Sequence, residues 1–242
     1  YRDSSLEYLY VILNKIAYFV SEDYISLLTI IAIITVYFNM KVILKLSINW
    51  GLSIYTYIVL GGYVFLFNGA RQGLAVAIFG MAILQIYNKN LKRYIFWVFI
   101  ASLFHTTALV MLPLYFLNFN KLSLKKSVLI GFLFTALIMS LSIILDFAND
   151  SIEDRYSVYE TRNAAGAYAL TFFYLINTIF LVYLKNRISI LYLKEYTFFL
   201  NLCILHTLIY IVVQFTGIDI NLVRLASYFQ LGFILIYPIV FK

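Results

Sequence analysis

The chain has 242 residues, of which 64% are hydrophobic and 12% are charged. A soluble domain is roughly half apolar and about a quarter charged, so this composition excludes an ordinary soluble domain and indicates an integral membrane protein. The net charge of +7 fits cationic loops on the cytoplasmic side of a membrane better than a nucleic-acid-binding surface.

Ahead of the first long apolar block, residues 6–20 place apolar side chains on one stripe of a helix. These side chains are Leu6, Leu9, Tyr10, Leu13, Ile16, Ala17 and Val20. We expect this helix to lie on the membrane surface, within an interfacial segment over residues 1–23.

The remaining apolar residues form blocks close to the length of about 20 residues that a helix needs to span a bilayer. Eight blocks are predicted as membrane segments: 24–40, 51–67, 70–87, 94–117, 127–147, 168–184, 196–215 and 221–241. The predicted fold is therefore all-α. It is a polytopic transmembrane helical bundle forming a single domain over 1–242, with a long outer loop at 148–167.

Basic residues decide the orientation of such a bundle, because they collect on the cytoplasmic side. If all blocks crossed in turn, Lys89 and Arg93 would lie on the opposite side from Lys121 and Lys125. A hairpin in block 94–117, turning near FHTTALVMLP, removes this conflict and places most of the 18 basic residues inside. The alternative is one long tilted helix, with the basic residues less well segregated.

Ionisable side chains in apolar segments cost about 2.5–3.5 kcal/mol to insert, so each needs a physical reason. Arg71 and Gln72 occupy the first turn of block 70–87, where a helix N-terminus already carries partial positive charge. Arg224 begins the last block in the same way, with Tyr228 a turn later. These positions predict binding of an anion such as diphosphate. The structural alternative is that each arginine extends to the lipid headgroups.

The predicted outer loop, NDSIEDRYSVYETRNAAG, brings acids, cations and tyrosines together. Glu153 and Asp154 are candidate general bases, Arg155 is a candidate anion ligand, and Tyr156 and Tyr159 are candidate lining residues. The alternative is a solvated loop with exposed ion pairs.

His105 lies next to the expected turn of block 94–117. An imidazole there is suited to accept a proton or to bond a sugar hydroxyl, and the alternative is a neutral ring bonded to a backbone carbonyl. The structural alternative is favoured for His206, which lies inside an apolar block. The sequence contains no metal motif, phosphate loop or dinucleotide fingerprint, so neither a metal nor a cofactor is predicted.

The order and spacing of these residues over most of the chain resemble a known family. The pattern is an Arg–Gln before a small-residue helix (NGARQGLAVAIFGMAI), an aromatic–His–small triplet with a later proline, an Arg–Tyr loop, and a late Arg with Ser–Tyr–Phe. It resembles the EpsG family of bacterial exopolysaccharide assembly proteins, which belong with the Wzy-like polysaccharide polymerases. Members usually have an earlier membrane segment and a Gly–x–Asp–Tyr stretch before the point that corresponds to Tyr1, and such residues, where they precede this sequence, would form part of the site.

The resemblance implies a glycosyltransferase of the bacterial cytoplasmic membrane. The growing glycan would pass from undecaprenyl diphosphate to a lipid-linked repeat unit at the outer face. Arg71, Arg155 and Arg224 would bind the diphosphate, while Gln72 and His105 would orient the acceptor or the site. The implied partners are the undecaprenyl-diphosphate-linked oligosaccharide, the lipid bilayer and other polysaccharide-assembly membrane proteins, with no nucleic acid.

Two other functions remain open at this point. One is a transporter or flippase for the same lipid-linked oligosaccharide, which would use the same arginines for binding. The other is a membrane acyltransferase that modifies the polysaccharide, because such enzymes also use an intramembrane histidine and arginine.

Overall fold

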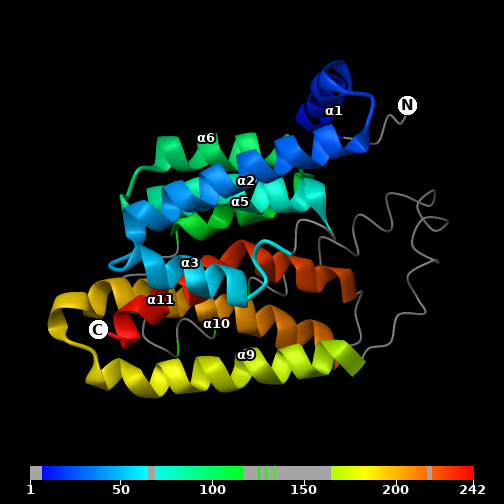
Figure 1. Cartoon of the computed structure of the whole chain (residues 1–242). Coiled ribbons are helices and arrows are strands. Elements are labelled where there is room, and N and C mark those ends of the chain that lie inside the picture. Colours follow the sequence, from blue (N-terminus) through cyan, green and yellow to red (C-terminus); the bar gives the residue numbers. More distant parts are fainter. Residues whose placement is uncertain are drawn as a thin grey trace. The chain divides into compact units, whose positions relative to one another are not determined.

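The structure, a computed structural model, describes residues 7–64, 69–116, 165–216 and 220–242, together with residues 125, 129 and 133. The described residues form α and 3₁₀ helices and no strand (Figure 1). The prediction of an all-helical chain is confirmed. The chain divides into two compact units, and the prediction of a single domain over 1–242 stays a prediction. Unit 1 is Tyr1–Asn118 with Gln230–Lys242, and unit 2 is Phe119–Phe229.

Unit 1 is built around one buried helix. Its described elements are α1 (Tyr8–Val20), α2 (Tyr24–Leu46), α3 (Trp50–Val59), α5 (Ala70–Tyr87), α6 (Leu91–Ser102), the 3₁₀ helix η1 (Thr106–Phe116) and α11 (Leu231–Val240). Nearly all side chains of α5 from Gln72 to Ile86 are buried. At Gly80 a Cβ atom would lie 3.1 Å from Leu231 Cδ1 and 3.3 Å from Val42 Cγ2. The missing side chain therefore lets α2 and α11 pack closely on α5, as small residues do in membrane bundles.

Hydrogen bonds between buried polar side chains and neighbouring helices hold α3 in unit 1. Asn39 of α2 donates from Nδ2 to the Tyr57 hydroxyl of α3 at 3.3 Å. Ser53 of α3 donates from Oγ to the Ile234 carbonyl oxygen of α11 at 3.0 Å. Such links between helices contribute about 0.6–2 kcal/mol each in membrane proteins.

The chain reverses direction between α6 and η1. Tyr94, near the start of α6, donates a hydrogen bond from its hydroxyl to the Met111 carbonyl oxygen of η1. Its ring also lies 5.3 Å from the ring of Tyr115. The start of α6 is thus beside the end of η1, with residues 103–105 at the turn. The expected hairpin in block 94–117 is present and the single long helix is wrong, whereas the depth of the turn in a membrane stays a prediction.

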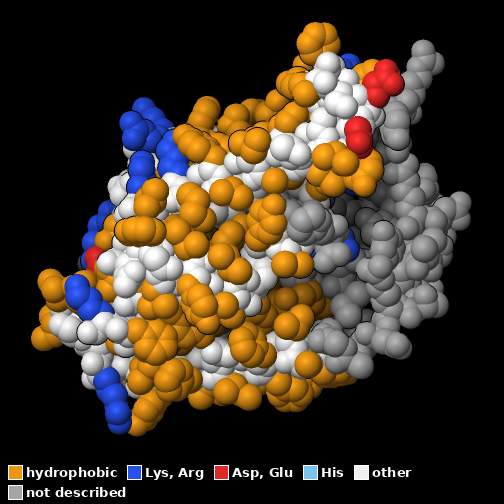
Figure 2. All heavy atoms as spheres, viewed as in Figure 1, with side chains coloured by type: hydrophobic (Ala, Val, Ile, Leu, Met, Phe, Trp, Pro, Cys, Tyr) orange, Lys and Arg blue, Asp and Glu red, His pale blue; other side chains and the backbone are white. Residues whose placement is uncertain are grey.

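The helix directions place the basic loops of unit 1 at one end. Ile31 packs with Leu74, and Val42 lies beside Gly80, so α2 and α5 run parallel. Both helices end next to basic residues, which are Lys45, Lys89, Lys92 and Arg93. Figure 2 shows Lys and Arg side chains at this end, and Asp and Glu side chains over α1. The segregation agrees with the predicted orientation, and which end faces the cytoplasm stays a prediction.

Helix α1 packs on the bundle with part of its apolar stripe. Leu13 joins Ile31 and Leu74 in one core cluster, against which Tyr10 also packs. Other stripe residues point outward, and Val20 is 68% exposed. The stripe therefore partly faces protein, and a location of α1 on the membrane surface stays a prediction.

Unit 2 contains an antiparallel pair of long helices. Its described elements are α9 (Ala165–Leu184), the 3₁₀ turns η3 (Lys185–Arg187) and η4 (Ile190–Tyr192), α10 (Leu193–Thr216) and the 3₁₀ helix η5 (Ile220–Phe229). The hydroxyls of Thr178 and Thr207 are hydrogen-bonded at 2.7 Å across the pair. Tyr196 donates from its hydroxyl to the Leu181 carbonyl oxygen at 2.5 Å. These bonds fix the register of α9 against α10.

Length and composition qualify four described helices as candidate membrane spans. They are Tyr24–Leu46, Ala70–Tyr87, Tyr168–Arg187 and Ile190–Phe215, and the bent pair Leu222–Phe229 with Leu231–Val240 makes a fifth if it counts as one span. This agrees with a multi-pass membrane protein, but the count of eight segments is not confirmed. The described part of block 51–67 contains the short α3, block 94–117 is divided by its turn, and block 127–147 lies almost wholly outside the described residues.

Candidate functional site

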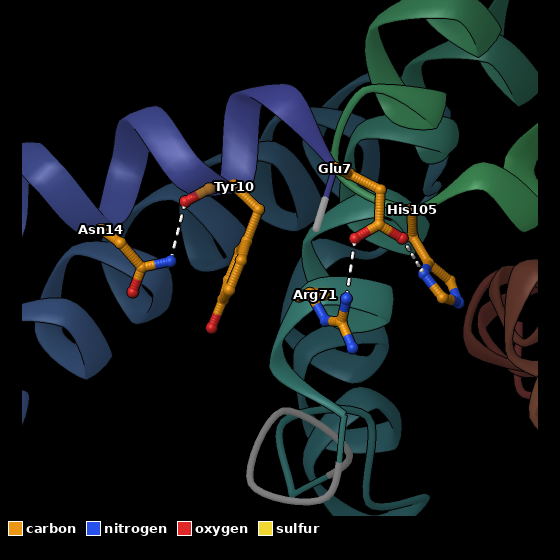
Figure 3. Close-up of polar contacts among 5 residues, drawn as sticks. All are labelled: Glu7, Tyr10, Asn14, Arg71 and His105. Carbon is orange, nitrogen blue, oxygen red and sulfur yellow. Dashed lines mark hydrogen bonds and ion pairs between the residues drawn. The ribbon is translucent and has the colours of Figure 1, made fainter. Parts of the chain in front are cut away.

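Three ionisable side chains from separate parts of unit 1 meet at the end opposite its basic loops (Figure 3). Glu7 precedes α1, Arg71 lies in the first turn of α5, and His105 lies at the turn after α6. Arg71 Nη1 donates to Glu7 Oε2 at 2.8 Å, and His105 Nδ1 lies 2.8 Å from Glu7 Oε1. One carboxylate therefore joins an arginine and a histidine that the sequence had selected separately.

Backbone and packing contacts hold Glu7 in this position. Glu7 is the N-cap residue of α1, yet its side chain makes no capping hydrogen bond. The Leu9 backbone N–H donates to the Leu103 carbonyl oxygen at 3.1 Å, two residues before His105. One turn further along α1, Leu13 packs with Leu74 of α5. Helix α1 is thus attached to both segments whose side chains its glutamate contacts.

The surroundings of Glu7 favour its ionised form. Its side chain is 11% exposed, compared with 39% for Arg71 and 24% for His105. Burial alone raises the pKa of the Glu7 carboxyl, but the hydrogen bond from His105, a hydrogen bond from the Glu7 backbone N–H and the charge of Arg71 outweigh it, and the pKa falls from 4.5 to about 2. The carboxylate is therefore charged at neutral pH.

Glu7 also explains how Arg71 is accommodated. The sequence argument predicted an external anion for a cation in the first turn of this helix, and that turn contains no acid of its own. The structure supplies an internal anion from α1. A guanidinium has several N–H donors, and one nitrogen, Nη1, contacts Glu7. Because the partly exposed Arg71 side chain otherwise lies over the Tyr10 ring at 5.7 Å, it retains donors for a ligand.

The structure describes only some of the other candidate residues. Gln72 is buried within α5. Arg224 and Tyr228 lie on η5 of unit 2, where Tyr228 is buried. The remaining candidates lie outside the described residues: Glu153, Asp154, Arg155, Tyr156 and Tyr159. A common site for these residues with Arg71 and His105 stays a prediction.

The two histidines have different surroundings. His206 Nδ1 lies 2.8 Å from the Ala226 carbonyl oxygen, and its ring packs in a cluster with the rings of Tyr174 and Tyr210. The carbonyl contact favoured for His206 is confirmed. For His105, the Nδ1 partner is a carboxylate rather than the backbone carbonyl of the structural alternative. Within the described ranges no group of His, Cys, Asp and Glu could hold a metal ion.

A protein-family model matches this sequence from its first to its last residue. The family model described as EpsG family matches residues 1–242. The chain belongs to the EpsG family. The resemblance found in the sequence is thus confirmed over its full length, while no curated protein and no solved structure gives a significant match.

Glu7 is the residue of this EpsG-family cluster that the sequence interpretation missed. It was treated as part of a surface helix, and no role was assigned to it. A signal existed, because Glu7 is an acid near the start of the apolar stripe, at the helix end where the dipole favours negative charge. The sequence could not show that the Glu7 carboxylate binds Arg71 and His105 and does not cap the helix backbone.

Proposed function

We propose that this EpsG-family protein is a Wzy-like polysaccharide polymerase of the bacterial cytoplasmic membrane. It would transfer a growing glycan from undecaprenyl diphosphate to a lipid-linked repeat unit at the outer face. Family membership supports the class of reaction. The observation that carries the proposal is the meeting of Arg71 and His105 around one carboxylate at a single end of unit 1.

This geometry suits the two requirements of the transfer. The leaving group is a lipid diphosphate, whose negative charge grows as the anomeric bond breaks. Arg71 is partly exposed and has donors beyond the one used by Glu7, so it can contact phosphate oxygens as the charge develops. The attacking group is a sugar hydroxyl, which requires a proton acceptor nearby, and His105 lies on the other side of the same carboxylate.

The test uses purified protein in liposomes that contain lipid-linked repeat units. Wild-type protein should yield longer lipid-linked glycans, resolved by gel or mass spectrometry. Arg71→Ala and His105→Ala should each lower the rate of elongation by about 10²–10³-fold while the protein remains in the membrane. Arg93→Ala is the matched control, because this exposed arginine lies at the opposite, basic end of unit 1.

The outcomes separate the candidate functions. Units that change leaflet without growing would indicate a flippase, and incorporation of an acyl donor would indicate an acyltransferase. Either result, or normal chain lengths in both the Arg71 and the His105 variants, would overturn the polymerase assignment.

A further inference from the structure

We infer that Glu7 is a positioning residue which makes His105 the general base of the transfer, by holding the ring proton on Nδ1 and leaving Nε2 to the acceptor hydroxyl. The inference rests on the proposed function and names the base that the sequence left unidentified. The carrying observation is the 2.8 Å contact between His105 Nδ1 and a carboxylate that Arg71 holds by its other oxygen.

The tautomer follows from the donors and acceptors present. An ionised carboxylate can only accept hydrogen bonds, so Nδ1 must be the donor in its contact with Glu7. A neutral imidazole carries one proton, so the lone pair is then on Nε2. In Figure 3 Nε2 points away from Glu7. His105 thus keeps an accepting nitrogen directed away from its internal partner, on a side chain that is 24% exposed.

Arg71 fixes both the orientation of the Glu7 carboxylate and its ionised state. Because Arg71 Nη1 binds Oε2 while His105 binds Oε1, rotation of the carboxylate would break both contacts. The arginine also helps to keep Glu7 ionised, so the acceptor of the Nδ1 proton is maintained. Arg71 therefore orients Glu7, and Glu7 in turn orients His105 and sets its tautomer.

In the transfer step, His105 Nε2 removes the proton of the acceptor hydroxyl as its oxygen forms a bond to the anomeric carbon of the donor glycan. The bond from that carbon to the diphosphate oxygen breaks, and the lipid diphosphate leaves with the electron pair. The imidazolium formed is stabilised by Glu7 and later returns its proton to water. No oxidant, reductant or further reactant is required.

The structure predicts an unusual sensitivity to Glu7→Gln. Arg71 can only donate, so it would bind the amide oxygen of the new side chain. The amide NH₂ group would then face His105 Nδ1 as a donor, and the imidazole would have to carry its proton on Nε2. This change keeps the size and shape of the side chain but would select the tautomer that cannot accept the hydroxyl proton.

The kinetic test uses the full chain in liposomes with lipid-linked repeat units. Glu7→Gln should lower kcat by about 10²–10⁴-fold, with the acceptor KM changed less than about threefold. Glu22→Gln is the control, because Glu22 is an exposed glutamate just beyond the other end of α1, where its carboxylate accepts a hydrogen bond from the Tyr18 hydroxyl. The double variant Glu7→Gln/His105→Ala should be no slower than His105→Ala alone, because Glu7 acts through His105.

A spectroscopic test applies to the unaltered protein and does not depend on a folded variant. The sequence has only 2 histidines, so ¹⁵N-histidine solid-state NMR at alkaline pH can resolve both rings, with His105→Ala for assignment. We expect the proton of His105 on Nδ1. A neutral His105 with its proton on Nε2 would overturn the inference, as would Glu7→Gln activity near that of wild type or rate losses that multiply in the double variant.

These results are separable from failure of the proposed function. If wild type makes no polymer, or if Arg71→Ala and His105→Ala polymerise normally, the polymerase assignment fails. If those two variants lose activity while Glu7→Gln does not, the assignment stands and only the role of Glu7 is refuted.

Discussion

The ion pair of Glu7 should control the attachment of α1 to unit 1 in a way that depends on pH. Lowering the Glu7 pKa from 4.5 to about 2 corresponds to about 3 kcal/mol in favour of the docked, ionised state. Arg71 is 39% exposed, so solvent screens part of this attraction, and we expect a contribution of about 1–2 kcal/mol. Loss of the charge in Glu7→Gln should raise the fraction of molecules with α1 detached by about 5- to 30-fold at neutral pH.

The sign of the pH dependence follows from the depressed pKa. Stabilisation is fully present above 4.5, the pKa of the detached carboxyl, and is lost as the pH falls toward about 2. The groups that face Glu7 are the Arg71 guanidinium and the His105 ring, and both are the same in the variant. The difference between wild type and Glu7→Gln should therefore shrink below about pH 4.5.

Detachment can be measured by the labelling rate of a buried thiol. Leu13→Cys, in a background with Cys203→Ala, places a thiol under α1 at a position that is 7% exposed. A pyridyl disulfide still reacts with thiols in acid, and rates are normalised to Phe19→Cys, whose position on the same helix is 92% exposed. Glu7→Gln should accelerate labelling at pH 7 and accelerate it less at pH 3, whereas Glu22→Gln should have little effect at either pH. An equal acceleration at both pH values would refute the electrostatic reasoning.

Two further predictions concern the hairpin formed by α6 and η1. Tyr94→Phe removes the hydroxyl that donates to the Met111 carbonyl oxygen. It should lower the free energy of unfolding by about 1–2 kcal/mol and the Tm in detergent by about 2–8 °C. An unchanged Tm would show that this bond does not hold the hairpin. Because the chain reverses, cysteines introduced at Asn90 and Phe116 should react with an impermeant reagent from the same side of the membrane, and labelling from opposite sides would contradict the reversal.

Local properties of the sequence were sufficient to predict much of the fold. Composition and block length gave a multi-pass helical protein, and the ends of block 70–87 match those of α5. The segregation of lysines and arginines favoured a reversal in block 94–117, since each basic loop has an electrostatic preference for one side of a bilayer. Arg71 and His105 were selected because a polar group in an apolar segment is costly wherever it lies.

Only the tertiary structure brought Glu7 into the site. Glu7 is separated from Arg71 by 64 positions and from His105 by 98, and helical periodicity carries no information over such distances. The contact exists because Leu13 packs α1 onto α2 and α5, which places the glutamate beside both partners. The sequence determined which side chains are costly to bury, through the local free energy of transferring each group from water. The partner that neutralises the charge of Arg71 was decided by packing between distant segments.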